Sequence, residues 1–473
     1  MINTKELTIK KTHEALKKGD FTVLELAETY LKNIEEKNKD INAYLEVFDD
    51  IKEQAEIAQK KFSDGTATIL TGIPMAVKDN ILIDGRKVGA ASKILKNYVA
   101  SYDATAISKL KKEGVVFLGR ANMDEFAMGG STENSAYGPT KNPYDLERVS
   151  GGSSGGSVAA VAMEGALVAL GSDTGGSVRQ PSSFCGTVGL KPTYGRVSRH
   201  GLMAMGSSLD QIGTIGKNVD DVEIVFKNIL GKDIFDSTSQ DAPENISTTK
   251  PKKIGVPFSF LKQGGIDESV LSNFNETVEK LKKEGYEIVD IDLPNNHYSL
   301  AVYYILMPAE VSSNMSRFDG VKYGEHKDGK NLLEDYMLTR GEGLGKEVRR
   351  RIILGTYVLS AGYYDAYYHK ANKVRALIAD DFRKAFEKVD VILTPTSPTP
   401  AFKIGEKSAD PISMYLADIF TVTANLVGTP ALSVPSGFTE KDGKKLPLGV
   451  QITAPHFRED ALFDVGRSIE GRV

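Results

Sequence analysis

Three short segments of this 473-residue chain carry side chains that could act together as a nucleophile and a base. The first, Gly72 to Asn80, is mostly apolar and contains Lys78. The second is the glycine- and serine-rich run from Ser150 to Ser157, and the third is Gly171 to Ser177. A serine hydroxyl alone is a weak nucleophile, so it needs an adjacent base and donors for the negative charge that develops on the substrate oxygen.

The turn Thr174-Gly175-Gly176-Ser177 is suited to supply those donors. Glycines let backbone N–H groups approach a substrate carbonyl closely, so we expect the amides of these four residues to form an oxyanion hole. All six histidines lie outside the three segments, so the usual base is missing from them. A lysine in an apolar site has a lowered pKa and can accept a proton near neutral pH, which makes Lys78 a candidate base.

Each segment also has a simpler interpretation. An isolated lysine after an apolar run usually extends its amine to solvent. The run at 150–157 could be a linker, and Ser177 could be an ordinary turn serine. Gly151 to Gly155 also matches the G-x-S-x-G nucleophile elbow of α/β-hydrolases, but that elbow follows a buried strand, and the preceding KNPYDLERVS is polar and contains Pro143.

Composition narrows the class of protein. Hydrophobic residues make up 41% and charged residues 26%, which is typical of globular chains, and a net charge of −4 is too balanced for broad nucleic-acid binding. The single cysteine, Cys185, excludes internal disulfides and indicates a reducing, cytoplasmic location. The sequence contains no phosphate-binding loop or metal-ligand motif, so we expect no metal and no cofactor in this chain. Its apolar stretches are too short to cross a membrane.

The pattern of residues predicts an α/β protein. Residues 1–65 are expected to form an N-terminal helical segment that packs on the core, with Thr22 and Glu25 as a capping box. Residues 66–473 are expected to form one catalytic domain with a helical insertion at about 300–388. Strands alternate with helices in this domain, so the candidate residues should lie at strand ends. The predicted strands fall near 69–77, 115–120, 167–173, 251–258, 286–294 and 390–398.

On the three segments quoted above, the sequence resembles the amidase signature family, whose hallmark is a Ser–cis-Ser–Lys triad. The resemblance implies that Ser177 is the acylated nucleophile, Ser153 the bridging serine that follows a cis peptide bond, and Lys78 the base. The order and spacing of these residues are those of the family. The resemblance also implies the family's fold, an α/β/α sandwich with a mixed central sheet, an N-terminal helical segment and a helical insertion.

The likeness extends over nearly the whole chain to one branch of this family, the subunits of tRNA-dependent amidotransferases that release ammonia from glutamine. The resemblance assigns Arg351, Asp418 and Tyr303 to glutamine binding, because glutamine carries an α-carboxylate and an α-ammonium. Arg351 could instead lie on a solvated helix face, Asp418 could be a surface residue, and Tyr304 is an equal candidate to Tyr303. The stretches that carry this likeness are GRANMDEFAMGGSTENSAYGPTKNP, SRFDGVKYG, RRRIILGTYVLSAGYYDAYY and ISMYLADIFTVTANLVGTPALSVP.

This branch implies two partners, the B and C subunits of a heterotrimer. The B protein would use ATP, magnesium and the released ammonia to convert Glu-tRNA(Gln) to Gln-tRNA(Gln), and the small C protein would hold the assembly together. The balanced charge agrees with a division in which the misacylated tRNA is bound mainly by the partner. A stand-alone serine amidase acting on small amides would have the same triad. A non-enzymatic scaffold with this fold is a further alternative, although such a protein would not need all three triad residues.

Overall fold

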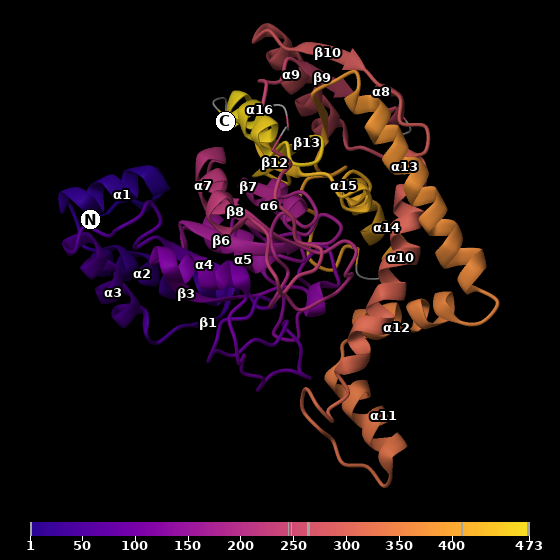
Figure 1. Cartoon of the computed structure of the whole chain (residues 1–473), viewed down its shortest axis with the longest axis horizontal. Coiled ribbons are helices and arrows are strands. Elements are labelled where there is room, and N and C mark those ends of the chain that lie inside the picture. The colour runs from indigo at the N-terminus through magenta and orange to yellow at the C-terminus, as the bar shows by residue number, and fades with distance from the viewer. Residues whose placement is uncertain (1, 245, 247, 263–264, 408–409, 471–473) are drawn as a thin grey trace.

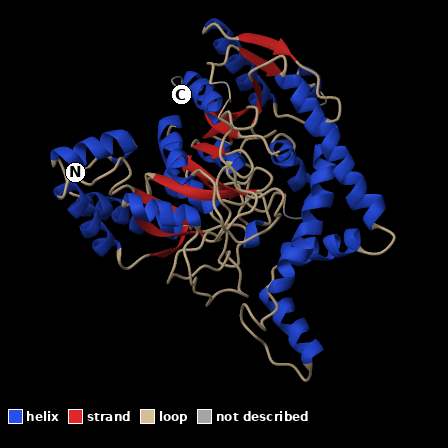
Figure 2. Ribbon diagram, viewed as in Figure 1, coloured by secondary structure: helices blue, strands red, loops and turns tan. Residues whose placement is uncertain are grey.

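The computed structural model describes residues 2–244, 246, 248–262, 265–407 and 410–470 (Figure 1). Its centre is a mixed sheet of eleven strands in the order β1-β3-β2-β6-β8-β7-β12-β13-β11-β9-β10, drawn in red in Figure 2. The strands of this sheet are β1 (Tyr44–Val47), β2 (Pro74–Lys78), β3 (Val116–Ala121), β6 (Val168–Asp173), β7 (Val188–Lys191), β8 (Gln211–Gly216), β9 (Lys253–Val256), β10 (Glu287–Asp290), β11 (Val391–Pro395), β12 (Ala431–Lys441) and β13 (Lys444–Thr453). A separate hairpin consists of β4 (Lys141–Asn142) and β5 (Asp145–Val149).

The direction of the strands decides where the candidate residues meet. Strands β3, β2 and β6 are parallel to one another, as are β11, β9 and β10, whereas the strands between these two groups pair antiparallel. Because β2 and β6 are parallel neighbours, their carboxyl ends lie at the same edge of the sheet. Lys78, the last residue of β2, therefore lies beside the turn that follows Asp173, the last residue of β6.

Helices cover both faces of the sheet, which confirms the expected α/β/α architecture. Helices α7 and α16 contact each other; α7 packs on β7 and β8, and α16 packs on β12 and β13. Helices α5 and α6 also contact each other; α5 packs on β6 and α6 packs on β7. Within the described residues, no helix is both long and apolar enough to span a membrane. The α-helices are α1 (Ile9–Lys18), α2 (Val23–Ile41), α3 (Ile51–Ser63), α4 (Thr105–Glu113), α5 (Gly155–Ala162), α6 (Arg179–Cys185), α7 (Val219–Ile229), α8 (Phe258–Leu261), α9 (Glu268–Lys283), α10 (Ser299–Asn314), α11 (Leu332–Gly343), α12 (Lys346–Leu359), α13 (Lys370–Phe386), α14 (Pro411–Tyr415), α15 (Val422–Val427) and α16 (Glu459–Glu470).

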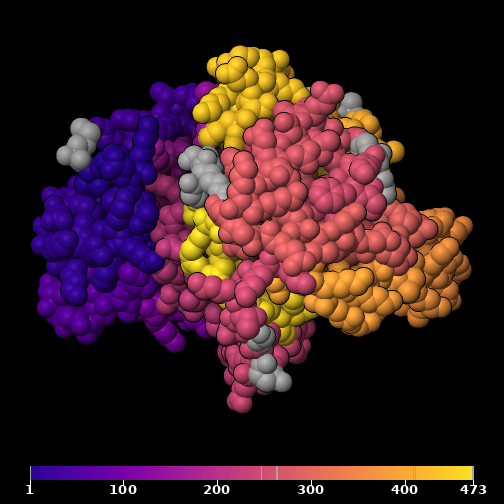
Figure 3. Space-filling view, turned by 90° about the horizontal axis from the view of Figure 1, so that it is seen from above, coloured from indigo at the N-terminus to yellow at the C-terminus, as the bar shows by residue number. Residues whose placement is uncertain are grey.

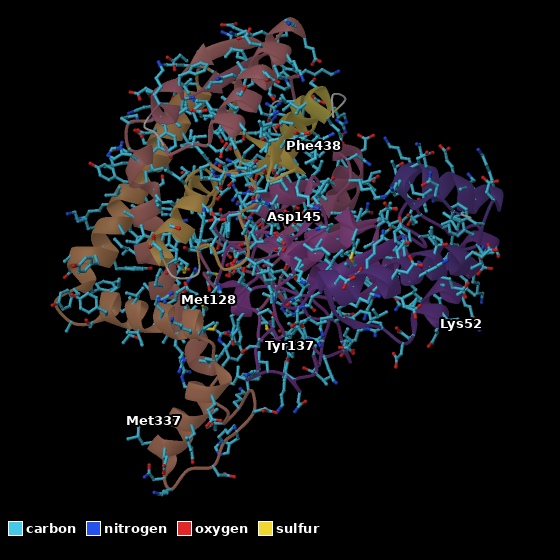
Figure 4. All side chains as sticks on the ribbon, turned by 180° about the vertical axis from the view of Figure 1, so that it is seen from behind. Lys52, Met128, Tyr137, Asp145, Met337 and Phe438 are labelled. Carbon is cyan, nitrogen blue, oxygen red and sulfur yellow. The ribbon has the colours of Figure 1, made fainter. Side chains whose placement is uncertain are left out.

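The stretch expected to be a helical insertion contains helices α10 to α13, which follow β10 and precede β11 in the chain. Helix α10 packs against α12, α13 and α15. Figure 3 shows this part of the chain, in orange, on the opposite side of the molecule from the N-terminal helices, in indigo. Helix α11, which carries Met337, projects from the body (Figure 4). These helices bring residues from beyond position 299 to the sheet edge that carries Lys78, as described below.

The N-terminal segment at residues 1–65 contains one short strand in addition to its helices. The predicted capping box is present, since Thr22 Oγ1 accepts a hydrogen bond from the Glu25 amide at 3.1 Å and the Glu25 carboxylate accepts one from the Thr22 amide at 2.7 Å. Between α2 and α3, however, residues Tyr44–Val47 form the edge strand β1, which pairs with β3. A strand of four residues is too short to show an alternating pattern in the sequence.

Candidate active site

Lys78 is fully buried at the end of β2, where its amine contacts three serine hydroxyls. The Nζ atom lies 2.8 Å from Ser153 Oγ, 2.8 Å from Ser154 Oγ and 2.9 Å from Ser172 Oγ. Burial lowers the pKa of Lys78 from 10.5 to about 7, although three nearby carboxylates oppose this shift. An amine with this pKa can accept a proton near neutral pH. Because Lys78 is fully buried, the simpler interpretation of a solvent-directed lysine is wrong.

Ser153 lies in the turn between β5 and α5, directly after a cis peptide bond that joins it to Gly152. The turn is held from two sides, since Gln180 Oε1 accepts the Gly152 N–H at 3.0 Å and the Asp124 amide donates to the Ser153 carbonyl at 3.2 Å. A Cβ atom on Gly152 would lie 2.1 Å from Asp124 Oδ2, so this position requires glycine. The cis bond implied by the resemblance is thus present in a closely packed turn.

Ser177 lies on the turn between β6 and α6 and is 7% exposed. Its carbonyl accepts a hydrogen bond from the Ser154 amide at 3.0 Å, so the two serine-containing turns are directly bonded. The structure therefore places Lys78, Ser153 and Ser177 in one site at the carboxyl ends of β2 and β6. The strand before Ser153, β5, pairs with β4 outside the large sheet, which excludes the α/β-hydrolase elbow.

The turn from Thr174 to Ser177 offers fewer donors than the sequence predicts. The Gly176 N–H donates to Asp173 Oδ1 at 3.0 Å, so it is already occupied by a carboxylate. Within the described part of the chain, the Thr174, Gly175 and Ser177 amides have no hydrogen-bond acceptor. These three amides remain candidates for the oxyanion hole. The Thr174 hydroxyl donates to Asp210 Oδ1 at 2.7 Å and so anchors the start of the turn.

A buried ion pair between Asp173 and Arg179 stabilises the same turn. Arg179 Nε and Nη2 reach the two carboxylate oxygens of Asp173 at 3.0 and 2.9 Å, and both side chains are fully buried. Burial alone would raise the pKa of Asp173, but the Arg179 guanidinium holds it well below its usual value. Sequence reasoning missed this pair. The two residues flank the glycine turn within GSDTGGSVR. Their opposite charges, on either side of a short turn, are the pattern that could have predicted the ion pair.

The predicted glutamine-binding residues approach this turn from later parts of the chain. Tyr303, on α10, is buried with its ring against the turn, because a Cβ atom on Gly175 would lie 2.5 Å from the Tyr303 hydroxyl oxygen. Tyr304 instead donates its hydroxyl proton to Asp418 Oδ2 at 2.9 Å. The two tyrosines are equal candidates in the sequence, but the structure gives them different contacts, because successive helix residues point about 100° apart. Tyr303 faces the reacting turn, and Tyr304 holds Asp418.

Arg351 is 4% exposed, whereas Arg349 on the same helix faces solvent, so the solvated-face interpretation does not apply to Arg351. Arg351 Nε donates to Glu347 Oε1 at 2.8 Å. The Arg351 guanidinium carbon lies 5.8 Å from the ring centroids of both Tyr304 and Tyr415. A buried guanidinium of this kind, with donors beyond those used by Glu347, is suited to bind a carboxylate.

Asp418, at the end of the short 3-10 helix Leu416–Asp418, is half-buried near the same group. Desolvation raises the pKa of Asp418 to about 7, while the Tyr304 hydroxyl and the Arg351 charge act in the opposite direction. A cavity of about 100 Å³ opens beside this group, between α12 and the loop that follows Met128. The cavity lining includes Arg351, Met414, Tyr415, Gly129 and Ser131. Of the three predicted glutamine-binding residues, Arg351 lines this cavity, whereas Asp418 and Tyr303 are not part of its lining.

Comparison with known proteins identifies the family of this chain. A family model described as Amidase matches residues 25–463. The A subunit of glutamyl-tRNA(Gln) amidotransferase from Thermoanaerobacter pseudethanolicus is 52% identical, over 98% of this chain and 96% of that protein, and its namesake from Koribacter versatilis is 50% identical, over 98% of each. The crystal structure of the corresponding protein from Thermotoga maritima has a TM-score of 0.81 and 42% identity, covering 99% of this chain and 95% of that one. The chain therefore belongs to the amidase family.

Proposed function

We propose that this chain is the glutamine-hydrolysing subunit of a glutamyl-tRNA(Gln) amidotransferase. The observation that carries the chemistry is the buried contact of 2.8 Å between Lys78 Nζ and Ser153 Oγ, on a turn bonded to that of Ser177. The likeness over almost the whole chain to the A subunits of such enzymes supports the assignment to an amidotransferase. The Lys78–Ser153–Ser177 set then has the roles of base, bridging serine and nucleophile.

The proposed reaction begins with two proton transfers. Lys78 takes the hydroxyl proton of Ser153, Ser153 takes that of Ser177, and Ser177 Oγ attacks the side-chain amide carbon of glutamine. The unoccupied amides of Thr174, Gly175 and Ser177 bind the oxyanion that forms. The proton on Lys78 then returns through Ser153 to the amide nitrogen, so that the C–N bond breaks and ammonia leaves. Water attacks the resulting ester by the same relay, which releases glutamate and restores Ser177.

Glutamine would be oriented by three side chains from the later part of the chain. The Arg351 guanidinium binds the α-carboxylate, and Asp418 binds the α-ammonium, which favours the ionised form of this carboxyl. Tyr303 packs on the glycine turn and closes the site beside Gly175.

The released ammonia would be consumed by the B and C subunits of a heterotrimer. In this proposal the B protein uses ATP and magnesium to activate the misacylated tRNA, the C protein completes the assembly, and this chain needs no cofactor. The net charge of −4 supports a division in which the tRNA is bound mainly by the partner. The single cysteine supports a cytoplasmic location.

Ammonia release from glutamine tests this proposal. It would be measured for the chain alone and then with the B and C proteins, ATP and Glu-tRNA(Gln), each beside Ser177→Ala. We expect release that rises strongly in the assembled, tRNA-containing system and is lost in the variant. Equal activity on many small amides by the chain alone, unchanged by the partners, would establish the stand-alone amidase instead. Wild-type release by Ser177→Ala, with contamination excluded, would contradict the assigned nucleophile.

A further inference from the structure

The amine of Lys78 has more hydrogen-bond partners than the proton relay through Ser153 uses. Beyond Ser153, it contacts Ser154 Oγ at 2.8 Å, Ser172 Oγ at 2.9 Å and the Ser172 carbonyl at 3.2 Å. Ser172 Oγ also accepts a hydrogen bond from Asn80 Nδ2 at 3.0 Å. Ser154, Ser172 and Asn80 are all at most 2% exposed, so no bulk solvent competes for these contacts.

The number of protons limits how these groups can bond. Ser154 donates its hydroxyl proton to the Ser172 carbonyl at 3.0 Å, so it can only accept from Lys78. Asn80 occupies one lone pair of Ser172 Oγ, which leaves the other lone pair for a Lys78 N–H. A neutral amine has two N–H groups and one lone pair. When the Ser154 and Ser172 hydroxyls accept the two N–H groups, two contacts remain; the Ser172 carbonyl can only accept, so the lone pair is directed at the Ser153 hydroxyl.

We propose that Ser172, held in place by Asn80, is a positioning residue for Lys78, because it accepts one N–H of the amine and thereby directs the amine's lone pair at Ser153. After Lys78 accepts the proton, its three N–H groups have the hydroxyl oxygens of Ser153, Ser154 and Ser172 as acceptors. The same three hydroxyl groups therefore bond to Lys78 in both its neutral and its charged form, without rearrangement. This inference rests on the proposed Lys78–Ser153–Ser177 mechanism.

The inference has a consequence for pH dependence. An acceptor that bonds to the charged form raises the pKa of an amine, so removal of the Ser172 hydroxyl should lower the pKa of Lys78. The charged groups that face Lys78 are the carboxylates of Asp124 after β3, Asp173 at the end of β6 and Asp210 before β8. Ser172→Ala leaves all three carboxylates in place, so a shift in this variant reports the lost hydroxyl.

The test measures the rate at which a fluorophosphonate labels Ser177 as a function of pH, together with glutamine hydrolysis. In Ser172→Ala we expect slower labelling and an acidic midpoint lower by about one pH unit. Asn80→Ala should shift the midpoint in the same direction but less, and Ser172→Thr, which keeps the hydroxyl, should restore the wild-type midpoint. Ser157→Ala is the matched control, because this buried hydroxyl donates to the Leu170 carbonyl at 3.0 Å instead.

The outcomes separate this inference from the proposed function. A wild-type chain that is not labelled at Ser177 would overturn both. Labelling of the wild type with an unshifted midpoint in Ser172→Ala would overturn the positioning role alone. An equal shift in Ser157→Ala would also overturn it, since the change would then follow from the loss of any buried hydroxyl. Thermal melting of each variant confirms that the labelled protein is folded.

Discussion

Replacement of Arg351 by alanine should remove most of the recognition of glutamine while Ser177 stays reactive. Arg351 is 4% exposed; its Nε donates to Glu347 at 2.8 Å, and its Nη1 has only the weak acceptor Met307 Sδ at 3.6 Å, so a carboxylate ligand could bind the Nη donors. A hydrogen bond to a charged group contributes about 1.5–3 kcal/mol, and a bidentate carboxylate contact contributes more than one such bond. A loss of about 3 kcal/mol corresponds to a fall of about a hundredfold in kcat/KM for glutamine.

Two assays distinguish loss of recognition from general damage. The first measures kcat/KM for glutamine, and the second measures labelling of Ser177 by a fluorophosphonate that has no carboxylate. Arg351→Ala should lower the first and leave the second within about twofold. Arg351→Lys should be intermediate, because lysine keeps the charge but lacks the planar pair of donors. Arg349→Ala, on the exposed face of the same helix, is the control and should match the wild type in both assays.

Two results would refute this reasoning. If Arg351→Ala hydrolysed glutamine with nearly wild-type kcat/KM, the guanidinium would not be the carboxylate-binding group. If labelling of Ser177 fell by the same factor as glutamine hydrolysis, Arg351 would act by stabilising the fold of the site rather than by binding substrate. A shift of the melting temperature in parallel with both losses would identify this second case.

Three further changes probe the base, the glycine turn and the buried ion pair. Because Lys78 has a pKa of about 7 and acts in its neutral form, glutamine hydrolysis should fall about tenfold between pH 8 and pH 6; a flat profile would contradict this role. Gly175→Ala would place a methyl group 2.5 Å from the Tyr303 hydroxyl oxygen, so hydrolysis should fall sharply although circular dichroism shows a folded chain; unchanged kcat would contradict the packing. Arg179→Met leaves the buried Asp173 carboxylate without its ion-pair partner, so the free energy of unfolding, measured by urea titration, should fall by about 3–5 kcal/mol. A fall below about 1 kcal/mol would contradict a buried ion pair.

The sequence could indicate the three candidate reacting residues because their signal is local. Lys78, Ser153 and Ser177 each lie in a short motif, and the two serine motifs are denser in glycine than the segments around them. The parallel pairing of β2 with β6, which brings these motifs together, depends on contacts between residues about 90 positions apart and leaves no local pattern. The role of Ser172 could not be inferred for the same reason, because it depends on where the end of a neighbouring strand lies.

Other features were beyond sequence reasoning for different physical reasons. Tyr303 and Tyr304 are the same residue type in succession, and only the rotation of α10 decides which of them faces Gly175. The sequence does not distinguish the Gly176 amide from the other amides of its turn, but in the fold this amide donates a hydrogen bond to the Asp173 carboxylate. The edge strand β1 is formed by backbone pairing with β3, which four residues of mixed character do not reveal.

The two halves of the site come from separate stretches of the chain. The proposed base, bridging serine and nucleophile lie between residues 78 and 177, at the end of β2, in the turn after β5 and in the turn after β6, whereas Tyr303, Arg351 and Asp418 all lie beyond residue 299. Under the proposed roles, mutations in the later stretch would alter which amide is accepted while the proton relay stays intact. A fold divided in this way can evolve new substrates gradually, because an ancestor need not lose its chemistry while it changes its specificity.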